Sequence, residues 1–410
     1  MRSKTLSGIL ATAILCSLLL SAHEAFASAS IKTLYSFAGV PDGQNPMGAL
    51  VFDNAGNLYG TTFSGGYKSN GTVFELSPSA GGAWTEKIIY TFAGGNDGAN
   101  PYAGLIIDLT GNLYGTAMNG GNKACFGGCG TTFRLHPTPG GQWQFKVLHQ
   151  FKGSDGANPD QILTMDSNGY LYGATRAGGS SNVGVIYQLF QLPHSTIYEF
   201  DVLHDFTGGA DGAYPVTPTI TIGDFFYGVA GGGGEFGQGT AFELLSTPYG
   251  PWNFQFLYAF SYAGGFDPES PLNYGLSSGF YGLSSGGGDF GFGTLYELTS
   301  PLGRHWIEGA VYSFTGNADG ELPSGPLTVG ISGDFYATTK SGKVEYGAAI
   351  QFSPNSAGGW TETTLVTFDG AGNSGISPQG GVVLDSFGNL YGVTQYGGQY
   401  QNGEIYEITP

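Results

Sequence analysis

The chain has 410 residues, of which 74 are glycine, 14% are aromatic and only 11% are charged. Its formal net charge of −18 disfavours binding to nucleic acid or anionic membranes, and is compatible with cations and neutral glycans. Abundant glycine often indicates disorder, but here it alternates with tyrosine, phenylalanine and valine at regular spacing, which is typical of turns between short strands.

The N-terminal segment, residues 1–27, predicts a signal peptide. Arg2 and Lys4 precede an apolar stretch that is too short to span a bilayer, and an Ala-Phe-Ala cleavage site follows it. We therefore expect a mature chain that begins near Ser28 and is secreted, periplasmic or extracellular. No later segment is apolar enough to predict a transmembrane helix.

Two sequence markers then recur along the chain at intervals of about 55 residues. The first is the tyrosine of a phrase similar to Leu-Tyr-Gly-Thr, at Tyr59, Tyr114, Tyr172, Tyr227, Tyr281, Tyr336 and Tyr391. The second is a phenylalanine that ends an apolar run, at Phe37, Phe92, Phe151, Phe206, Phe260, Phe314 and Phe368. Because two independent markers share one period, residues 28–410 are interpreted as one repeat domain.

Each repeat reads as four short strands. In the second repeat, runs rich in β-branched and aromatic residues, bounded by Gly, Pro and Asn, predict strands over residues 103–108, 113–117, 131–135 and 143–151. Seven units of four antiparallel strands predict an all-β fold, a seven-bladed β-propeller.

The two ends of the domain are complementary. Residues 31–37 resemble a fourth strand, whereas residues 404–409 resemble a third strand, so the last repeat lacks its outer strand. We expect the N-terminal strand to pair with the last repeat, which closes the ring and removes an open sheet edge.

A tryptophan lies eight residues before the marker phenylalanine in five repeats, at Trp84, Trp143, Trp252, Trp306 and Trp360. An even offset places both side chains on one face of a strand, so we interpret these tryptophans as packing between blades rather than as sugar-stacking residues. In the second repeat Cys125 and Cys129 lie close together in a loop without histidine, which predicts a disulfide in an exported protein.

An Asp-Gly pair opens most connections between repeats. Its aspartates are Asp42, Asp97, Asp155, Asp211 and Asp319, with Asp267 and Asn373 taken as their counterparts in the remaining repeats. If these carboxylates point inward, they form a ring that a hard cation such as Ca²⁺ would relieve. The alternative, which their repetition favours, is that each aspartate caps its own turn. The sequence predicts no other cofactor.

The loops after the second strands differ between repeats and are therefore better functional candidates. Their polar and aromatic residues are Tyr67, Lys68, Lys123, Phe126, Arg176, Glu235, Phe236, Asp289, Phe290, Lys340, Lys343, Tyr346, Gln399 and Tyr400. Rings beside amides and carboxylates suit carbohydrate or peptide recognition, unless they fold back onto the blades. We select Tyr67, Phe236, Phe290 and Tyr400 as the predicted ligand-binding residues.

No catalytic motif is present. The sequence has no nucleophile elbow, zinc-protease motif or phosphate-binding loop, and His149 and His204 occupy one repeated strand position. The sequence leaves open a pair of carboxylates that could cleave a glycosidic bond, because pairing across the fold is not visible in it.

The repeat text itself resembles the GloVer tandem-repeat family. The resemblance rests on Gly-Asn-Leu-Tyr-Gly-Thr at residues 111–116, Gly-Thr-Val-Phe-Glu-Leu-Ser-Pro at residues 71–78 and Gly-Asn-Leu-Tyr-Gly at residues 388–392. It implies an exported bacterial protein, but it implies no activity and no functional residues. The family is named for varied C-terminal surface anchors, and this chain ends at Pro410 without a sorting tail.

These observations favour an exported, monomeric binding module over an enzyme. The leading hypothesis is recognition of extracellular or cell-surface glycans on the face that carries the variable loops and the long connections between repeats. An interaction scaffold for envelope proteins is the alternative, and a glycan-cleaving enzyme is a third reading.

Overall fold

The computed structural model describes residues 29–192, 195–220, 225–246, 252–275, 279–303, 305–342, 346–371 and 374–410. The predicted signal peptide, together with Lys343 and Asn373, lies outside these ranges. Within them the fold is all-β apart from one short 3-10 helix, Pro301–Gly303. None of the described helices is both long and apolar enough to cross a membrane.

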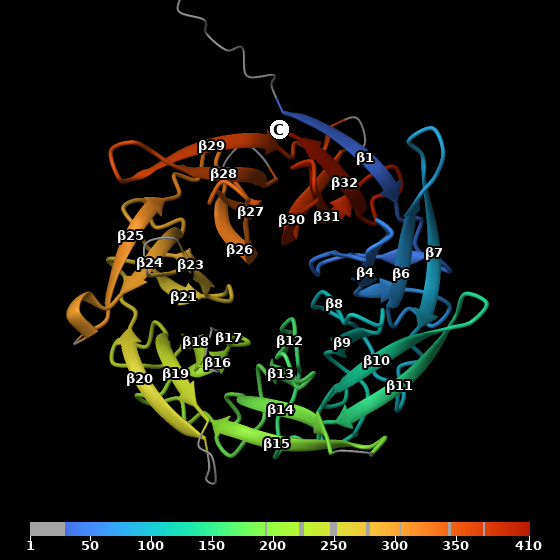
Figure 1. Ribbon diagram of the computed structural model, residues 1–410, viewed down its shortest axis with the longest axis horizontal. Coiled ribbons are helices and arrows are strands. Elements are labelled where there is room, and N and C mark those ends of the chain that lie inside the picture. The colour runs from blue at the N-terminus through green and yellow to red at the C-terminus, as the bar shows by residue number, and fades with distance from the viewer. Residues whose placement is uncertain are drawn as a thin grey trace, which may run out of the picture.

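The described strands form a ring of seven small antiparallel sheets around a central channel, which confirms the predicted seven-bladed β-propeller (Figure 1). Blade 1 contains β3 (Val51–Phe52), β4 (Leu58–Thr62), β6 (Thr72–Pro78) and β7 (Trp84–Thr91). Blade 2 contains β8 (Ile106–Ile107), β9 (Leu113–Ala117), β10 (Thr131–Thr138) and β11 (Gln142–Gln150). Blade 3 contains β12 (Thr164–Met165), β13 (Leu171–Ala174), β14 (Val185–Gln191) and β15 (Tyr198–Asp205).

In blades 4 and 5 the innermost strand is split into two short pieces. Blade 4 contains β16 (Ala213–Pro215), β17 (Thr219–Ile220), β18 (Phe225–Gly232), β19 (Thr240–Leu245) and β20 (Asn253–Ala259). Blade 5 contains β21 (Phe266–Pro268), β22 (Asn273–Tyr274), β23 (Phe280–Gly286), β24 (Thr294–Thr299) and β25 (Ile307–Ser313). Blade 6 contains β26 (Glu321–Val329), β27 (Phe335–Ser341), β28 (Ala348–Pro354) and β29 (Trp360–Thr367).

Blade 7 combines the two ends of the domain. It contains β30 (Gly375–Leu384), β31 (Leu390–Gly397) and β32 (Glu404–Thr409), and its outer strand is β1 (Ser30–Ser36). β1 pairs antiparallel with β32, with Ile31 opposite Ile408 and Ser36 opposite Glu404. The predicted closure of the ring is confirmed. A small ribbon of β2 (Gly43–Gln44) and β5 (Ser64–Gly65) joins the entry of blade 1 to the loop after its second strand.

In six of the seven sheets, packing inside the sheet requires the glycine of the repeated Leu-Tyr-Gly phrase. Gly60 lies opposite Phe74, and a Cβ at Gly60 would lie 2.5 Å from the end of the Phe74 ring. Blade 6 has Ala337 at this position, and the residue opposite is the aliphatic Ile350. In blade 6 the change from glycine to alanine is therefore accommodated because the residue opposite is smaller than the aromatic residue in the other blades.

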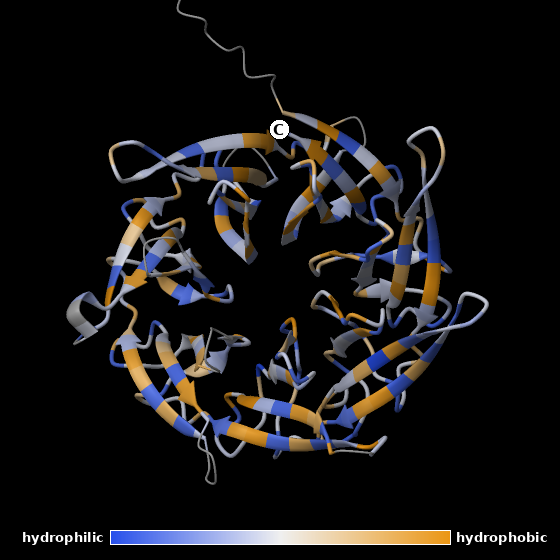
Figure 2. Ribbon diagram, viewed as in Figure 1, coloured by the Kyte–Doolittle hydropathy of each residue, from blue (hydrophilic) through white to orange (hydrophobic). Residues whose placement is uncertain are grey.

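The hydrophobic core lies between neighbouring blades. One cluster joins Tyr59 and Val73 of blade 1 to Leu113 and Phe133 of blade 2. The five repeated tryptophans pack between blades, as predicted, because each contacts the marker tyrosine of the preceding blade. For example, the ring centres of Trp143 and Tyr59 are 5.7 Å apart. On the rim strands, hydrophobic and hydrophilic residues alternate (Figure 2).

The innermost strand of blade 2 is shorter than predicted. β8 covers Ile106–Ile107 rather than residues 103–108. The residues before it approach the backbone of blade 1, where a Cβ at Gly104 would lie 2.4 Å from the Ala49 carbonyl oxygen. This close contact between blades replaces strand pairing within blade 2.

Candidate functional site: a pocket at the channel mouth

The predicted disulfide is present. Cys125 and Cys129 are bonded, with their Cα atoms 5.0 Å apart, in the loop that follows β9. Their bond closes a short loop on the face of the ring that carries the connections between blades.

The five Asp-Gly aspartates each bind within their own connection. Asp42 Oδ2 accepts hydrogen bonds from the Tyr35 hydroxyl at 2.9 Å and from the Ala38 amide at 2.8 Å. Equivalent bonds, from the tyrosine or histidine near the end of a rim strand and from a nearby backbone amide, are made by Asp97, Asp155, Asp211 and Asp319. Across the described ranges, no three His, Cys, Asp or Glu side chains are grouped so that they could hold a metal ion. This geometry is the turn-capping alternative given above, and Ca²⁺ binding stays a prediction.

Asp267 does not belong to that set, and its predicted alignment was wrong. It has a φ of 55°, as do Asn45 and Asn100, which stand just before the repeated proline. The connection into blade 5 is one residue shorter than that into blade 1, so Gly264 takes the place of the capping aspartate and Asp267 falls three positions later.

The residue that follows the repeated proline faces the central channel in every blade. These seven residues are Met47, Tyr102, Asp160, Val216, Glu269, Ser324 and Gln379, and all of them line one cavity. We call this cavity the channel pocket. Its volume is about 140 Å³, which is room for about five water molecules at roughly 30 Å³ each.

A second set of lining residues comes from the ends of the second strands. Arg176 follows Thr175 after β13, Gly231 follows Ala230 on β18, and Lys340 follows Thr339 on β27, so the three occupy equivalent positions in blades 3, 4 and 6. The channel pocket is thus formed by one ring of seven residues and by three residues from a second repeated position, and the side chains at both positions differ between blades.

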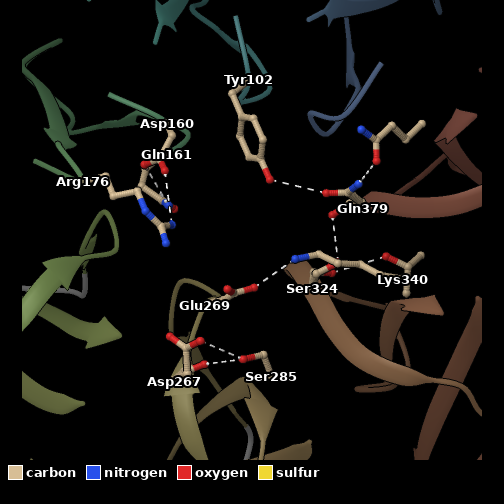
Figure 3. Close-up of polar contacts among 12 residues, drawn as sticks. Tyr102, Asp160, Gln161, Arg176, Asp267, Glu269, Ser285, Ser324, Lys340 and Gln379 are labelled. Carbon is tan, nitrogen blue, oxygen red and sulfur yellow. Dashed lines mark hydrogen bonds and ion pairs between the residues drawn. The ribbon is translucent and has the colours of Figure 1, made fainter. Parts of the chain in front are cut away.

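Two ion pairs lie in the channel pocket (Figure 3). Arg176 Nη1 is 3.6 Å from Asp160 Oδ2 in the same blade, and Lys340 Nζ of blade 6 is 3.1 Å from Glu269 Oε2 of blade 5. The Arg176 guanidinium also lies over the Tyr214 ring, 5.7 Å from its centre. Both basic side chains of the pocket are therefore already paired with carboxylates.

Hydrogen bonds also connect residues of the channel pocket that belong to neither ion pair. The Tyr102 hydroxyl of blade 2 donates to Gln379 Oε1 of blade 7 at 3.4 Å, and the Gln379 side-chain amide donates to Gln395 (Figure 3). In blade 5 the Ser285 hydroxyl donates to Asp267 Oδ2 at 3.0 Å. Tyr102, Gln379 and Asp267 thus present polar atoms to the same cavity.

Two carboxyl groups of the pocket have perturbed acidity. Burial raises the pKa of Asp160, although the Arg176 charge opposes this shift. Burial also raises the pKa of Asp267, and the neighbouring Glu269 charge raises it further. Perturbed carboxyl groups in a concave site are a feature of binding and catalytic sites.

The opposite side of the pocket is built from backbone. A Cβ at Gly48 would lie 2.3 Å from the Gly104 amide nitrogen, and one at Gly325 would lie 2.5 Å from the Gln379 carbonyl oxygen. Blades 6, 7, 1 and 2 therefore approach each other closely through glycines, whereas the carboxylates come from blades 3 and 5.

The four predicted ligand-binding aromatic residues lie elsewhere. Tyr67, Phe236, Phe290 and Tyr400 are all exposed, Tyr67 to 79%, and none of them lines the channel pocket. Tyr67 lines a separate open groove along β7. Of the wider set of loop candidates, Arg176 and Lys340 do line the pocket, so the sequence identified its two cations.

The sequence interpretation missed Tyr102, Asp160, Glu269 and Gln379. A signal was present, because the Pro before each of them is repeated in every blade while the next residue changes each time. Because the residue after the proline differs in every blade, it cannot have the same packing role in each of them. Such a position is a better candidate for ligand binding than the repeated residues beside it.

Comparison with known proteins supports the repeat interpretation. The profile of the Gloeobacter/Verrucomicrobia repeat matches residues 24–187, 124–250 and 246–410, which together cover nearly the whole chain. The chain belongs to this repeat family. The family match is consistent with the GloVer resemblance. A search of curated protein sequences finds no significant match.

Several solved structures share the fold at low sequence identity. An ulvan lyase of polysaccharide lyase family 25, solved with a bound -[GlcA(1-4)Rha3S]- saccharide, has a TM-score of 0.56 at 12% identity, over 92% of this chain and 95% of its own. The extracellular domain of a proposed hybrid two-component system of B. thetaiotaomicron has a TM-score of 0.56 at 11% identity, over 91% of this chain and 39% of its own. A hypothetical selenium-binding protein from Sulfolobus tokodaii has a TM-score of 0.51 at 12% identity, over 76% of each chain. At these identities the similarity establishes the propeller fold and nothing more.

Proposed function

We propose that this chain is an exported β-propeller that binds a glycan in the channel pocket. The observation that carries the proposal is the asymmetry of the pocket. Structural needs recur in each blade, but the pocket residues Tyr102, Asp160, Arg176, Glu269 and Lys340 each occur in one blade only. Such a mixture of aromatic, acidic and basic groups on one concave surface is typical of a ligand site.

The chemistry of the pocket suits a sugar. Carboxylates, amides and hydroxyls accept and donate the hydrogen bonds that sugar hydroxyls need, and Tyr102 and Tyr214, which line the pocket, offer apolar surface for a ring. The fold neighbour solved with a saccharide gives a precedent for glycan chemistry on a propeller of this size.

The export component has its own support. A disulfide between Cys125 and Cys129 is compatible with an oxidising, extracytoplasmic compartment. Cell fractionation and N-terminal sequencing of the product should give an exported chain that begins near Ser28; a cytoplasmic chain with an intact N-terminus would overturn this component.

The binding site is tested by alanine substitutions with glycan-array screening followed by calorimetry. Tyr102→Ala should weaken glycan binding by about tenfold or more, which corresponds to about 1.4 kcal/mol. Tyr400→Ala is the matched control, because Tyr400 is an exposed aromatic residue outside the pocket. Both variants should keep the melting temperature within a few degrees.

The same experiment tests the exposed aromatic surface. If Tyr67→Ala or Tyr400→Ala weakens binding while Tyr102→Ala does not, the ligand binds the outer loops, as the sequence predicted. If no glycan binds and these substitutions instead abolish capture of one envelope protein, the chain is an interaction scaffold.

A glycan-cleaving activity is the second candidate. It is favoured by one observation, the presence of Asp160, Asp267 and Glu269 in one pocket with raised pKa values at both aspartates. Two carboxyl groups of differing acidity are the machinery of glycoside hydrolysis. Release of reducing ends from a bound glycan, lost in Glu269→Gln, would establish it; binding without turnover would exclude it for that glycan.

A further inference from the structure

The carboxylates of the channel pocket differ in whether they form an ion pair. Asp160 is paired with Arg176, and Glu269 is paired with Lys340. Asp267 has no ion pair with any residue of the described chain, and its side chain accepts a hydrogen bond from Ser285.

In blade 4, the position that carries a basic side chain in blades 3 and 6 lies next to Asp267. Arg176 and Lys340 stand at equivalent positions at the ends of the second strands of blades 3 and 6, and blade 4 has Gly231 there. A Cβ at Gly231 would lie 2.7 Å from Asp267 Oδ1. Blade 4 therefore points its bare backbone at the Asp267 carboxylate, at the site where two other blades supply a positive charge.

The charge of the pocket is consequently unbalanced. Asp160, Asp267 and Glu269 face only Arg176 and Lys340, and the chain as a whole carries −18. An unpaired carboxylate in a partly desolvated cavity is unfavourable until a cation approaches it. A carboxylate or sulfate on the ligand would instead have to break an existing ion pair.

We propose that the channel pocket binds an amino sugar, whose protonated amine lies beside Asp267 on the side of the carboxylate that lines the cavity. This inference rests on the proposed glycan binding and specifies its ligand class. The ammonium group supplies the positive charge that blade 4 lacks, and the neighbouring Glu269 adds to the attraction. The sugar hydroxyls then meet Tyr102 and Gln379 across the channel.

The test is calorimetry of the purified full-length product with three oligosaccharides of equal length: glucosamine oligomers, N-acetylglucosamine oligomers and galacturonic acid oligomers. Glucosamine oligomers should bind about tenfold tighter than their N-acetylated counterparts, because acetylation removes the charge. The preference should decrease as salt is raised, since part of the pocket is open to solvent. Galacturonate should bind weakest.

Asp267→Asn should abolish the preference for the free amine, with the two hexosamine oligomers then binding within about twofold of each other. Asp289→Asn is the matched control, because it removes the same charge from an exposed loop of blade 5 outside the pocket. Thermal melting checks that both variants are folded.

Each outcome bears on one of the two proposals. If the N-acetylated or acidic oligomer binds as tightly as the glucosamine oligomer, the amine inference is overturned while glycan binding stands. If the preference survives Asp267→Asn, the assignment to Asp267 is overturned. If none of the three binds, the amino-sugar inference fails, and the array screen with Tyr102→Ala decides glycan binding separately.

Discussion

Most of the interfaces between the rim strands of neighbouring blades fall into two groups, which differ in the residue that packs against a repeated aromatic side chain. Near the end of six of the seven rim strands an aromatic residue meets the rim strand of the next blade, and blade 6 has Val366 at this position. Between blades 1 and 2, 2 and 3, and 3 and 4, it stacks on a phenylalanine, as His149 does on Phe200 with ring centres 3.7 Å apart. At three other interfaces the partner is Glu86, Glu308 or Glu362.

The difference teaches that this repeated position on the rim strand accepts either an apolar or an ionisable side chain. The two choices have different effects on the stability of the interface. The stacked phenylalanine interfaces gain from ring contact and apolar burial. The glutamates lose hydration: Oε1 of Glu86 and of Glu308 is buried and accepts no hydrogen bond from the described part of the chain. Burial raises the pKa of both carboxyl groups to about 7.

The largest expected effect is the loss of a stacked interface. Phe200→Ala removes the ring that lies on His149 and also contacts Phe151 and Tyr187. We expect a loss of about 3 kcal/mol in the free energy of unfolding, because a large partly buried ring leaves a cavity. Urea denaturation measures it. A loss below about 1 kcal/mol would show that stacking does not hold these blades together.

A smaller effect is expected from pH at the glutamate interfaces. Because the folded-state pKa values of Glu86 and Glu308 lie near 7 and the unfolded value lies near 4.5, the folded state binds more protons between these values. Stability should therefore be complete below about pH 4.5 as far as these two groups are concerned, and should fall as pH rises to about 7.

The double substitution Glu86→Gln with Glu308→Gln should remove that dependence. At pH 8 it should stabilise the chain by about 1 kcal/mol per site, a figure discounted for partial exposure to solvent. Thermal melts of both proteins between pH 5 and pH 8 measure the difference. If the wild-type and double-variant curves stay parallel, the carboxyl groups are ionised in the folded chain at no cost.

The smallest effect concerns the histidines within the stacked interfaces. Burial lowers the pKa of His204, although the hydrogen bond to Asp211 opposes the shift. Since the lowered pKa belongs to the folded state, stability from this group is present above its unfolded pKa near 6.5 and is lost as pH falls.

His204→Tyr provides the matched substitution, because tyrosine occupies the same position next to Asp97 in blade 1. The variant should keep the ring stack and should lose less stability than the wild type, by a few tenths of a kcal/mol, between pH 7 and pH 5. Denaturation at the two pH values measures this. A variant that is as acid-sensitive as the wild type would show that His204 does not contribute.

The fold was predictable from the sequence because its determinants are local and repeated. Tyr59, Phe92 and their counterparts each recur once per blade, so their spacing gives the length and number of the blades. The complementary ends at residues 31–37 and 404–409 predicted how the ring closes. The split inner strands of blades 4 and 5 were not predicted, because they depend on contacts with neighbouring blades.

The site was only partly predictable, for a physical reason. Arg176 and Lys340 were found because they stand where the second strands run into the variable loops, but their partners Asp160 and Glu269 each follow a proline in a repeated connection. Only closure of the ring brings one such residue from each blade to the same channel. The misplacement of Asp267 had a simpler cause, a connection shortened by one residue.

The channel, like the rim, has two unlike sides, and ligand binding depends on that contrast. Glycine backbone from blades 6, 7, 1 and 2 closes one side, and the charged side chains stand mainly on the other. The most direct test is a crystal structure of the chain with a bound glucosamine oligosaccharide. We predict a sugar ring in the channel pocket with its amine within about 3 Å of Asp267. A sugar held on the outer loops at Tyr67, Phe236, Phe290 or Tyr400, with the channel pocket left to solvent, would contradict the account.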